Sequence, residues 1–286
     1  MISEVNEALE YREGMLTRTA LCFNQSELAR IVNSTVAIAG LGGVGAITVE
    51  LLARWGVKTF RLLDKDRYEP SNLNRQLFAT SKTLGEAKVD AAARRIKEIN
   101  PYAEIEQSFC ARVDNQNVHE FVNGAGIVIQ NTDHPSSRLF YHAARLHRVP
   151  LVNGYATITG GRVQTFDYRL SPCKTIFDSW WDRTKFAGLK SIEEMDPGEL
   201  DEFDRRYVHA TAPSVNFVTN TVGCIIVAEA IKLISGRGRP VLYPKYIEFD
   251  VFDSRMTIRS SYTPTVSQLK KAARVIWKRI GSGRTQ

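Results

Sequence analysis

A run of glycines between an apolar segment and a helical segment constrains the fold of this chain most. Residues 36–56 read VAIAGLGGVGAITVELLARWG and contain Gly40, Gly42, Gly43 and Gly45. Three of these glycines fit the spacing G-x-G-x-x-G between a strand and a helix, which lets a backbone approach a phosphate. Asp64 stands 19 residues after Gly45, where an acid reaches a ribose hydroxyl. The pattern predicts a nucleotide site and leaves open whether the nucleotide is a cofactor or a substrate.

Short apolar runs alternate with helical segments from residue 35 onward. Strands are expected at 35–40, 59–64, 103–109, 125–133 and 149–154, and helices at 43–55, 85–100, 135–148 and from 114. This alternation predicts an α/β fold with a Rossmann-like, doubly wound, mainly parallel sheet and helices on both faces. After residue 160 we expect an exposed strand at 161–170, a long apolar helix at 212–236 and strands at 245–253 and 255–261. These later strands predict an antiparallel extension.

The composition excludes several classes of protein. The 286 residues contain no run that approaches the roughly 18 apolar residues of a membrane span, and the first residues lack a secretory signal. We therefore expect a cytoplasmic protein without membrane contact. The net charge of +7 is spread along the chain without a recognition motif, so nucleic acid is not an expected partner.

The four cysteines (Cys22, Cys110, Cys173 and Cys224) lie far apart in the sequence and form no CxxC pair. This spacing argues against a disulfide framework and against a zinc site with four thiolates. Cys224 stands in an apolar helical segment, where a small buried side chain is expected.

Cationic and amide side chains follow Asp64 along the chain. Asn72, Arg75 and Gln76 stand in the loop after the second strand, and Lys88 stands on the next helix. A triphosphate needs more positive charge than a dinucleotide, aimed where pyrophosphate leaves. Asp133 ends the fourth strand and is a candidate Mg²⁺ ligand. Each residue has a simpler role as a surface charge or helix cap, but their convergence on one glycine turn favours a triphosphate.

These segments resemble the ThiF/MoeB/HesA family, whose fold is shared with the adenylation domains of ubiquitin-activating enzymes. The resemblance covers about residues 16–252 and rests on GLGGVG, LLDKDRYEPSNLNRQLF, GEAKVDAAARRIKEINP, NTD, VPLVNG and ATAPSVNFVTNTVGCIIVAEAIKLI. It implies ATP and Mg²⁺ as reactants. The implied reaction is adenylation of a carboxylate, usually the terminal carboxylate of a small protein or peptide.

The resemblance also implies roles for individual residues. Asp64 would bind the ribose and Asp133 the magnesium, and the remaining nucleotide contacts would come from Gly40, Gly42, Gly43, Gly45, Asp66, Asn72, Arg75, Gln76 and Lys88. Catalytic roles would fall to Arg75, Lys88, Asp133 and Arg18. The family is typically homodimeric, and Arg18 in MLTRTALCF would reach the neighbouring site. Residues 1–30 are therefore expected to form a helical arm at the dimer contact.

The domain boundaries and the departures from the family refine this hypothesis. The adenylation domain is expected at 31–261, with a polar, irregular crossover loop at 171–210, and a basic helix at 262–286. Only Cys173 remains of the two CxxC pairs that hold zinc in many members, so no zinc is expected. Residues 174–210 contain no cysteine that could form a thioester.

The main hypothesis is an enzyme that forms an acyl-adenylate on a short ribosomally made peptide during antibiotic biosynthesis. Loss of the zinc ligands and of the thiol favours this reading. The alternatives are activation of a ubiquitin-like or sulfur-carrier protein, adenylation and dehydration of a tRNA base, an NAD-dependent oxidoreductase, and an inactive nucleotide-binding partner subunit. The substrate, the nucleophile that consumes the adenylate and the pathway stay open.

Overall fold

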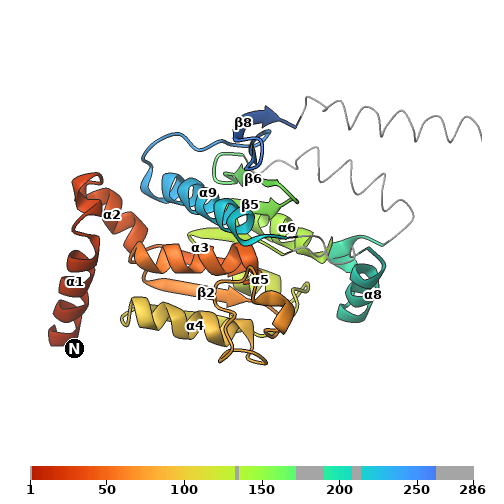
Figure 1. Cartoon of the computed structure of the whole chain (residues 1–286), viewed down its shortest axis with the longest axis horizontal. Helices are drawn as coiled ribbons and strands as arrows, with labels where there is room; N and C mark the ends of the chain where they lie inside the picture. The colour runs from red at the N-terminus through yellow and green to blue at the C-terminus, as the bar shows by residue number, and fades with distance from the viewer. Residues whose placement is uncertain (1, 133–134, 172–189, 208–213, 262–286) are drawn as a thin grey trace, which may run out of the picture.

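The computed structural model describes residues 2–132, 135–171, 190–207 and 214–261 (Figure 1). In these ranges the strands are β1 (Thr35–Ala39), β2 (Thr59–Leu63), β3 (Glu104–Phe109), β4 (Ile127–Gln130), β5 (Leu151–Ala156), β6 (Gly160–Phe166), β7 (Lys245–Asp250) and β8 (Arg255–Ser260). The α-helices are α1 (Ile2–Leu16), α2 (Gln25–Val32), α3 (Gly43–Arg54), α4 (Lys88–Ile99), α5 (Asn117–Val122), α6 (Leu139–Leu146), α8 (Pro197–Tyr207) and α9 (Asn216–Ser235). Short 3₁₀ turns are η1 (Thr19–Leu21), η2 (Pro70–Asn72), η3 (Pro135–Arg138) and η4 (Ile192–Glu194).

All eight strands join one mixed sheet in the order β3-β2-β1-β4-β5-β6-β7-β8. Strands β1 to β5 are parallel, and β6, β7 and β8 continue the sheet in antiparallel pairing. The predicted fold class and its antiparallel extension are therefore confirmed. The chain leaves β1 toward β2 and β3 on one side, and β4 lies on the other side. The strand order therefore reverses at β1, and open α/β sheets bind ligands outside the carboxyl ends of the strands at such a point.

Helices cover both faces of the sheet and bury two apolar cores. Alternate residues of β1 point to opposite faces, as the pleat requires: Val36 and Ile38 pack into one core, and Ala37 and Ala39 into the other. Helices α3, α4 and α9 cover the first face, whereas α5, α6 and α8 contribute to the second core (Figure 1). The central strands read as continuous apolar runs because both of their faces are buried.

Helix α9 is the core helix of the first face. Although the sequence has no uninterrupted apolar run of that length, this helix is long and apolar enough on average to cross a membrane, by length and composition alone, and 56% of its apolar window is buried within the protein. Gly223 allows α9 to approach α3 closely, because a Cβ there would lie 2.3 Å from Ile47 Cγ2 and 3.0 Å from the Val44 carbonyl oxygen. Helix α9 ends at Gly236, which adopts the left-handed conformation that favours glycine at helix ends.

Two expectations from the sequence are wrong in this region. The strand expected to be exposed, β6, is mostly buried, because β5 and β7 pair with its two edges and α9 packs on one face. The segment 171–210 is not irregular throughout: η4 and the 11-residue helix α8 lie within it. The acidic residues of α8 hide its apolar positions in the sequence, where Leu200 and Phe203 are spaced for one helical face. The helix expected at 262–286 lies outside the described residues.

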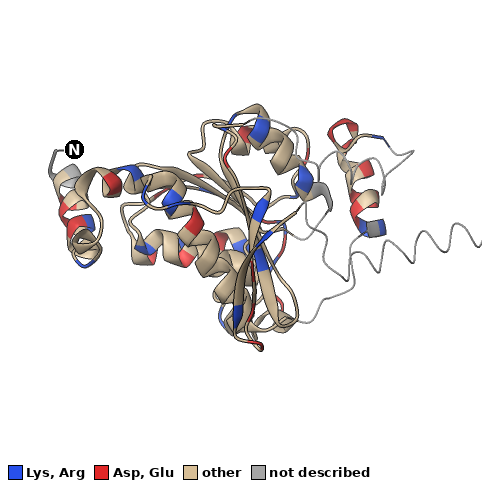
Figure 2. Ribbon diagram, turned by 90° about the horizontal axis from the view of Figure 1, so that it is seen from above, with Lys and Arg blue, Asp and Glu red and all other residues tan. Residues whose placement is uncertain are grey.

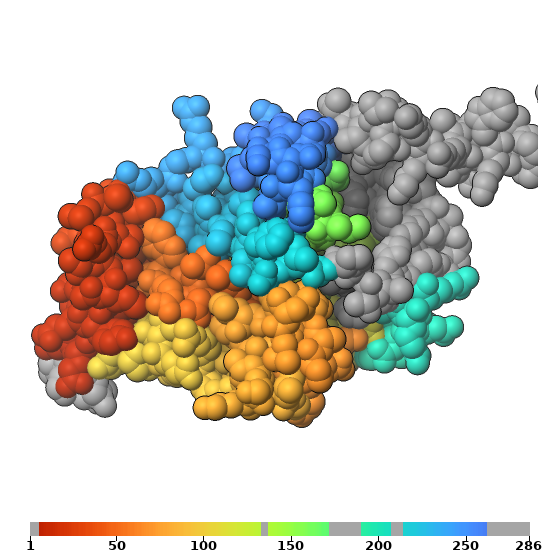
Figure 3. Space-filling view, in the orientation of Figure 1, coloured from red at the N-terminus to blue at the C-terminus, as the bar shows by residue number. Residues whose placement is uncertain are grey.

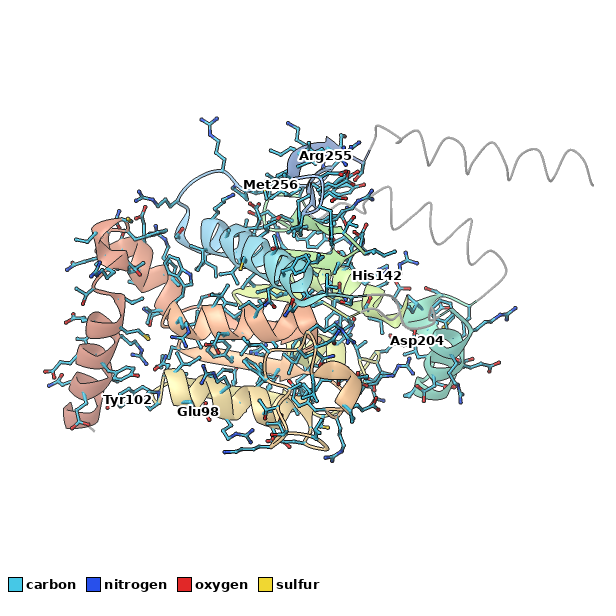
Figure 4. The ribbon with its side chains drawn as sticks, in the orientation of Figure 1. Glu98, Tyr102, His142, Asp204, Arg255 and Met256 are labelled. Carbon is cyan, nitrogen blue, oxygen red and sulfur yellow. The ribbon has the colours of Figure 1, made fainter. Side chains whose placement is uncertain are left out.

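Helix α8 and η4 are fastened to the body of the protein by polar contacts as well as by apolar burial. Arg112 forms ion pairs with Asp201 and Asp204, and Asn115 donates a hydrogen bond to the Met195 carbonyl oxygen at 2.6 Å. On the other side, His142 Nδ1 of α6 lies 2.6 Å from Glu193 Oε1. Figure 4 labels His142 and Asp204, on α6 and α8 respectively. The segment that begins at residue 190 is therefore anchored to the rest of the described protein.

We predict that Gly223→Ala lowers the free energy of unfolding by about 1–3 kcal/mol, because the added methyl group overpacks the contact between α3 and α9. Urea denaturation checks this value. Gly14→Ala is the matched control: no atom lies within 4 Å of a Cβ at Gly14 of α1, so this variant is expected to be neutral or about 0.5–1 kcal/mol more stable. Equal stabilities of the two variants would contradict the close packing at Gly223.

Candidate active site

The strand register brings three residues to one level at the carboxyl edge of the sheet. Ala39 lies opposite Leu63 of β2 and opposite Gln130 of β4. The residues that follow these three strand ends are therefore neighbours: Gly40, Asp64 and Asn131. Backbone bonds fix this level, since the Gly40 amide donates to the Leu63 carbonyl at 2.9 Å and the Asn131 amide donates to the Ala39 carbonyl at 2.8 Å.

The turn between β1 and α3 tolerates only glycine at two positions. Gly40 has a φ of +81°, and a Cβ there would lie 2.7–2.9 Å from the backbone of residues 131 and 132. A Cβ at Gly45 would lie 1.8 Å from the Gly40 carbonyl oxygen. Gly42 caps α3 without a side-chain hydrogen bond. No capping side chain therefore occupies the first amides of α3. An anion that approached the turn could accept hydrogen bonds from these amides.

Asp64 supports the glycine turn from the end of β2. Its Oδ2 accepts the Leu41 amide at 2.6 Å, and its Oδ1 accepts the Asp66 amide at 2.8 Å. The side chain is buried. Burial raises the pKa of the Asp64 carboxyl above its usual value, although the charge of Lys88 and the two amide bonds oppose this shift. Each oxygen retains acceptor capacity for a ligand hydroxyl.

Lys88 is linked to the same group of residues through Asp66. Its side chain is only 7% exposed, and Nζ lies 3.1 Å from Asp66 Oδ2. The Lys88 amide, at the start of α4, donates to the Asp66 carbonyl at 3.0 Å. Lys88 is therefore a buried cation whose carboxylate partner is half exposed. An incoming phosphate can compete for its ammonium group.

The turn at 69–76 carries the other predicted phosphate ligands. Asn72 is buried and holds the turn, because its Oδ1 accepts the Glu69 amide at 3.1 Å. Gln76 is also buried, and its Nε2 would lie 3.7 Å from a Cβ at Gly42, so its amide borders the glycine turn. Arg75 Nη1 donates to the Ser71 carbonyl at 2.8 Å and to Asn74 Oδ1 at 2.9 Å. Both of these acceptors are neutral, so these contacts leave the charge of Arg75 uncompensated.

A row of buried amides holds the loop after β4. Asn153 of β5 donates to the Gln130 carbonyl at 2.9 Å and to the Gln130 side chain. Gln130 Nε2 in turn donates to the carbonyl and the hydroxyl of Thr132, at 2.9 and 2.8 Å. Both amide side chains are buried. The backbone around residues 131 and 132 is therefore fixed beside Gly40.

The sequence did not single out Asn131. Its side-chain Nδ2 and Oδ1 are both buried without a hydrogen-bond partner, and Nδ2 would lie 3.7 Å from a Cβ at Gly45. The signal that could have identified Asn131 was its position directly after a buried strand, at the same level of the sheet as Gly40 and Asp64. The buried partners Gln130 and Asn153 were missed for a different reason: their contact depends on the pairing of β4 with β5.

The structure does not describe two of the residues singled out in the sequence, and it places a third, Arg18, away from this group. Asp133 and Cys173 lie outside the described residues. Arg18 is exposed and stands directly before η1. The preceding residues, Met15 and Leu16, contact Gly56 beyond the carboxyl end of α3, so a 12-residue helix, about 18 Å long, separates Arg18 from the glycine turn of its own chain. The dimer contact and the trans role of Arg18 stay predictions.

The expectation that Cys224 is buried is wrong. Its side chain is exposed on α9, because only part of the helix surface meets α3 and the sheet. Partial burial nevertheless raises the pKa of the Cys224 thiol. In the described ranges, no cluster of three or more His, Cys, Asp or Glu side chains is arranged to hold a metal ion.

Lys and Arg residues alternate with Asp and Glu residues along the described ribbon in this view (Figure 2).

Fold and geometry together define an α/β protein with a Rossmann-like sheet, a glycine turn at the uncapped start of α3 and a buried lysine, Lys88, linked to the same group of residues. Residues 16–268 match the ThiF family. The chain is 31% identical over 225 residues to the SAMP-activating enzyme E1 of Haloferax volcanii, covering 78% of this chain and 75% of the relative. It is 28% identical over 236 residues to the molybdopterin-synthase adenylyltransferase of Salmonella typhimurium, covering 82% and 85%.

The chain therefore belongs to the ThiF family, and its reaction class is ATP-dependent adenylation. This assignment sets aside the alternatives of an NAD-dependent oxidoreductase and an inactive partner subunit. A crystal structure of Escherichia coli MccB with AMPCPP and MccA shares the fold, with a TM-score of 0.64 at 18% identity, covering 82% of this chain and 66% of that chain. The sequence relatives thus favour the sulfur-carrier type of alternative over the peptide hypothesis, because the likeness to MccB concerns the fold alone.

Proposed function

We propose that this chain adenylates the C-terminal carboxylate of a small protein of the sulfur-carrier type. The observation that carries the proposal is that Gly40, Asp64 and Asn131 lie at one level of the sheet, beside the uncapped start of α3. The likeness to two adenylating enzymes over about four-fifths of the chain supports this class of substrate.

The proposed reaction is one displacement at phosphorus. A carboxylate oxygen of the substrate attacks the α-phosphorus of ATP, and a new O–P bond forms. The bond between the α-phosphorus and the bridging oxygen breaks, and pyrophosphate leaves with the electron pair. Negative charge grows on the departing group, so cations fixed nearby lower the barrier. Mg²⁺ would arrive as the MgATP complex.

The chain's own residues divide this work. The amides of α3 and the turn at Gly42 would receive the phosphate nearest the ribose, and Asp64 would accept the ribose hydroxyls. Lys88 and Arg75 would stabilise the departing pyrophosphate. The buried position of Lys88 suits this role because its charge is weakly screened by water. Asp133, which the resemblance assigns to magnesium, is retained in this proposal as the metal ligand.

An exposed apolar strip supports a protein substrate. It consists of Phe217 on α9, Phe252 after β7, and Met256 and Ile258 on the edge strand β8, with exposed fractions of 47%, 65%, 62% and 62%. The rings of Phe217 and Phe252 lie 5.8 Å apart between centroids. Figure 3 shows the start of α9 between β8 and the loop that follows β2, on the face that carries the turn at 69–76. Exposed apolar patches of this kind mark protein contacts.

The adenylate would pass to a nucleophile outside the crossover segment, because residues 174–210 contain no cysteine. Exposed Cys224 has a raised pKa and is therefore a poor nucleophile near neutral pH. We further propose that the chain acts as a homodimer in which Arg18 reaches the neighbouring site, since Arg18 is remote from its own glycine turn.

The function is tested by pyrophosphate exchange into ATP, measured with purified chain, MgATP and a candidate small carrier protein with an intact C-terminus. We expect exchange that depends on the carrier and disappears when its last residue is amidated. A short ribosomally made peptide is the second candidate, favoured by the lack of CxxC pairs in the sequence and the fold shared with MccB. Exchange with the peptide and not with carriers would overturn the main proposal.

Replacement of the proposed phosphate ligands should separate turnover from binding. Arg75→Ala and Lys88→Ala are expected to lower kcat about 10²- to 10³-fold, because they act on charge that develops in the transition state. Asp64→Ala is expected to raise the KM for ATP with a smaller change in kcat, since a ribose contact is made equally in both states.

The matched control for these variants is Lys97→Ala, an exposed lysine in the last turn of the same helix as Lys88. Its kinetic constants should equal those of the unmodified chain. Full turnover in Lys88→Ala would contradict the proposed role of this cation.

The apolar strip should affect recognition of the carrier and not of ATP. Phe252→Glu and Met256→Glu are expected to raise the KM for the carrier about tenfold or more, because a charge is placed in an interface that must lose water. The affinity for ATP should not change. Leu170→Glu, an equally exposed apolar position outside the strip, serves as the control. Unchanged KM values in both strip variants would place the substrate elsewhere.

A further inference from the structure

The side chain of Asn131 is a polar group without a partner at the centre of the site. Both its donor, Nδ2, and its acceptor, Oδ1, are buried and form no hydrogen bond within the described chain. The neighbouring amides differ: Asn153 donates a hydrogen bond to Gln130, and Gln130 donates hydrogen bonds to Thr132. A buried amide without partners costs free energy, so such groups in native proteins call for an explanation.

The location of Asn131 indicates what the missing partner is. Its backbone abuts Gly40, and its Nδ2 lies beside the first turn of α3, 3.7 Å from a Cβ at Gly45. This is the end of α3 where the helix amides have no capping side chain. An anion that binds these amides therefore lies within reach of the Asn131 donor.

The strand register indicates which phosphate group of the nucleotide lies near Asn131. Asp64 and Asn131 flank the glycine turn from β2 and β4, on opposite sides of β1. A nucleotide whose ribose contacts Asp64 places its α-phosphate, which is bonded directly to the ribose, over the glycine turn between them. The β- and γ-phosphates extend farther from the ribose, and Lys88 is linked to the Asp64 side of the site through Asp66.

We propose that Asn131 is a nucleotide-binding residue whose Nδ2 donates a hydrogen bond to an oxygen of the α-phosphate. The contact persists after pyrophosphate leaves, because the α-phosphate remains in the adenylate. This inference rests on the nucleotide placement proposed above and not on the identity of the carboxylate. Asn131 therefore distinguishes AMP from adenosine.

The test compares the affinities of AMP and adenosine for the full chain, measured by competition with a fluorescent ATP analogue. Asn131→Ala is expected to weaken the affinity for AMP about 10- to 100-fold, which is the range for one hydrogen bond to a charged group. The affinity for adenosine should change less than twofold. Asn131→Asp preserves the volume but replaces the donor with a negative charge, so its loss of AMP affinity should be at least as large. Asn123→Ala, an exposed asparagine before the opposite end of β4, is the control.

Thermal unfolding without nucleotide separates binding from structure. Since neither polar atom of Asn131 has a partner, Asn131→Ala should retain or raise the Tm of the free chain while the stabilisation by AMP decreases. If the Tm fell and the affinities for AMP and adenosine decreased equally, Asn131 would have a structural role, and the proposal would be overturned. An unchanged AMP affinity in both variants, or a wild-type chain that binds AMP no better than adenosine, would overturn it as well.

These results are independent of the carrier experiment. A chain that discriminates AMP through Asn131 but shows no carrier-dependent exchange would refute the proposed substrate and leave the role of Asn131 intact.

Discussion

The contact of three backbone segments at Gly40 is the constraint on which the site depends. The turn after β1, the first turn of α3 and the loop after β4 meet so closely that a Cβ at Gly40 or Gly45 would overlap backbone atoms. This contact places the start of α3 at the point where the strand order reverses. Asp64 reinforces the contact by accepting a hydrogen bond from the Leu41 amide. The uncapped start of α3 is therefore a property of the backbone, and in the proposed function Lys88 and Asn131 would add charge and selectivity to it.

The antiparallel half of the sheet carries the exposed residues Met256 and Ile258, whereas the glycine turn lies in the parallel half. Strands β6, β7 and β8 extend the sheet beyond β5, and α9 joins the two halves by packing on α3 as well as on β5 and β6. The outer edge of this extension presents Met256, labelled on β8 in Figure 4, to solvent.

The comparisons change the balance between the two substrate hypotheses. The sequence alone favoured a peptide because zinc ligands and a crossover thiol are lacking. The likeness to enzymes of carrier activation extends over most of the chain, whereas the likeness to MccB is one of fold at 18% identity. A missing zinc pair changes the support of one loop. It does not change the chemistry at the glycine turn, so it is weak evidence about the substrate.

The sequence by itself determined the family, the alternation of strands and helices along the chain and the residues of the glycine turn, because these are encoded by local spacing and apolar periodicity. Asp64 and Lys88 followed from their positions at strand and helix ends. Only the tertiary structure decided which side chains find partners. Whether Cys224 is exposed and whether α8 forms both depend on which surfaces the other elements of the fold cover. The unpartnered amide of Asn131, beside the paired amides of Gln130 and Asn153, depends on strand register. Such pairings join residues distant in sequence, and local patterns carry no information about them.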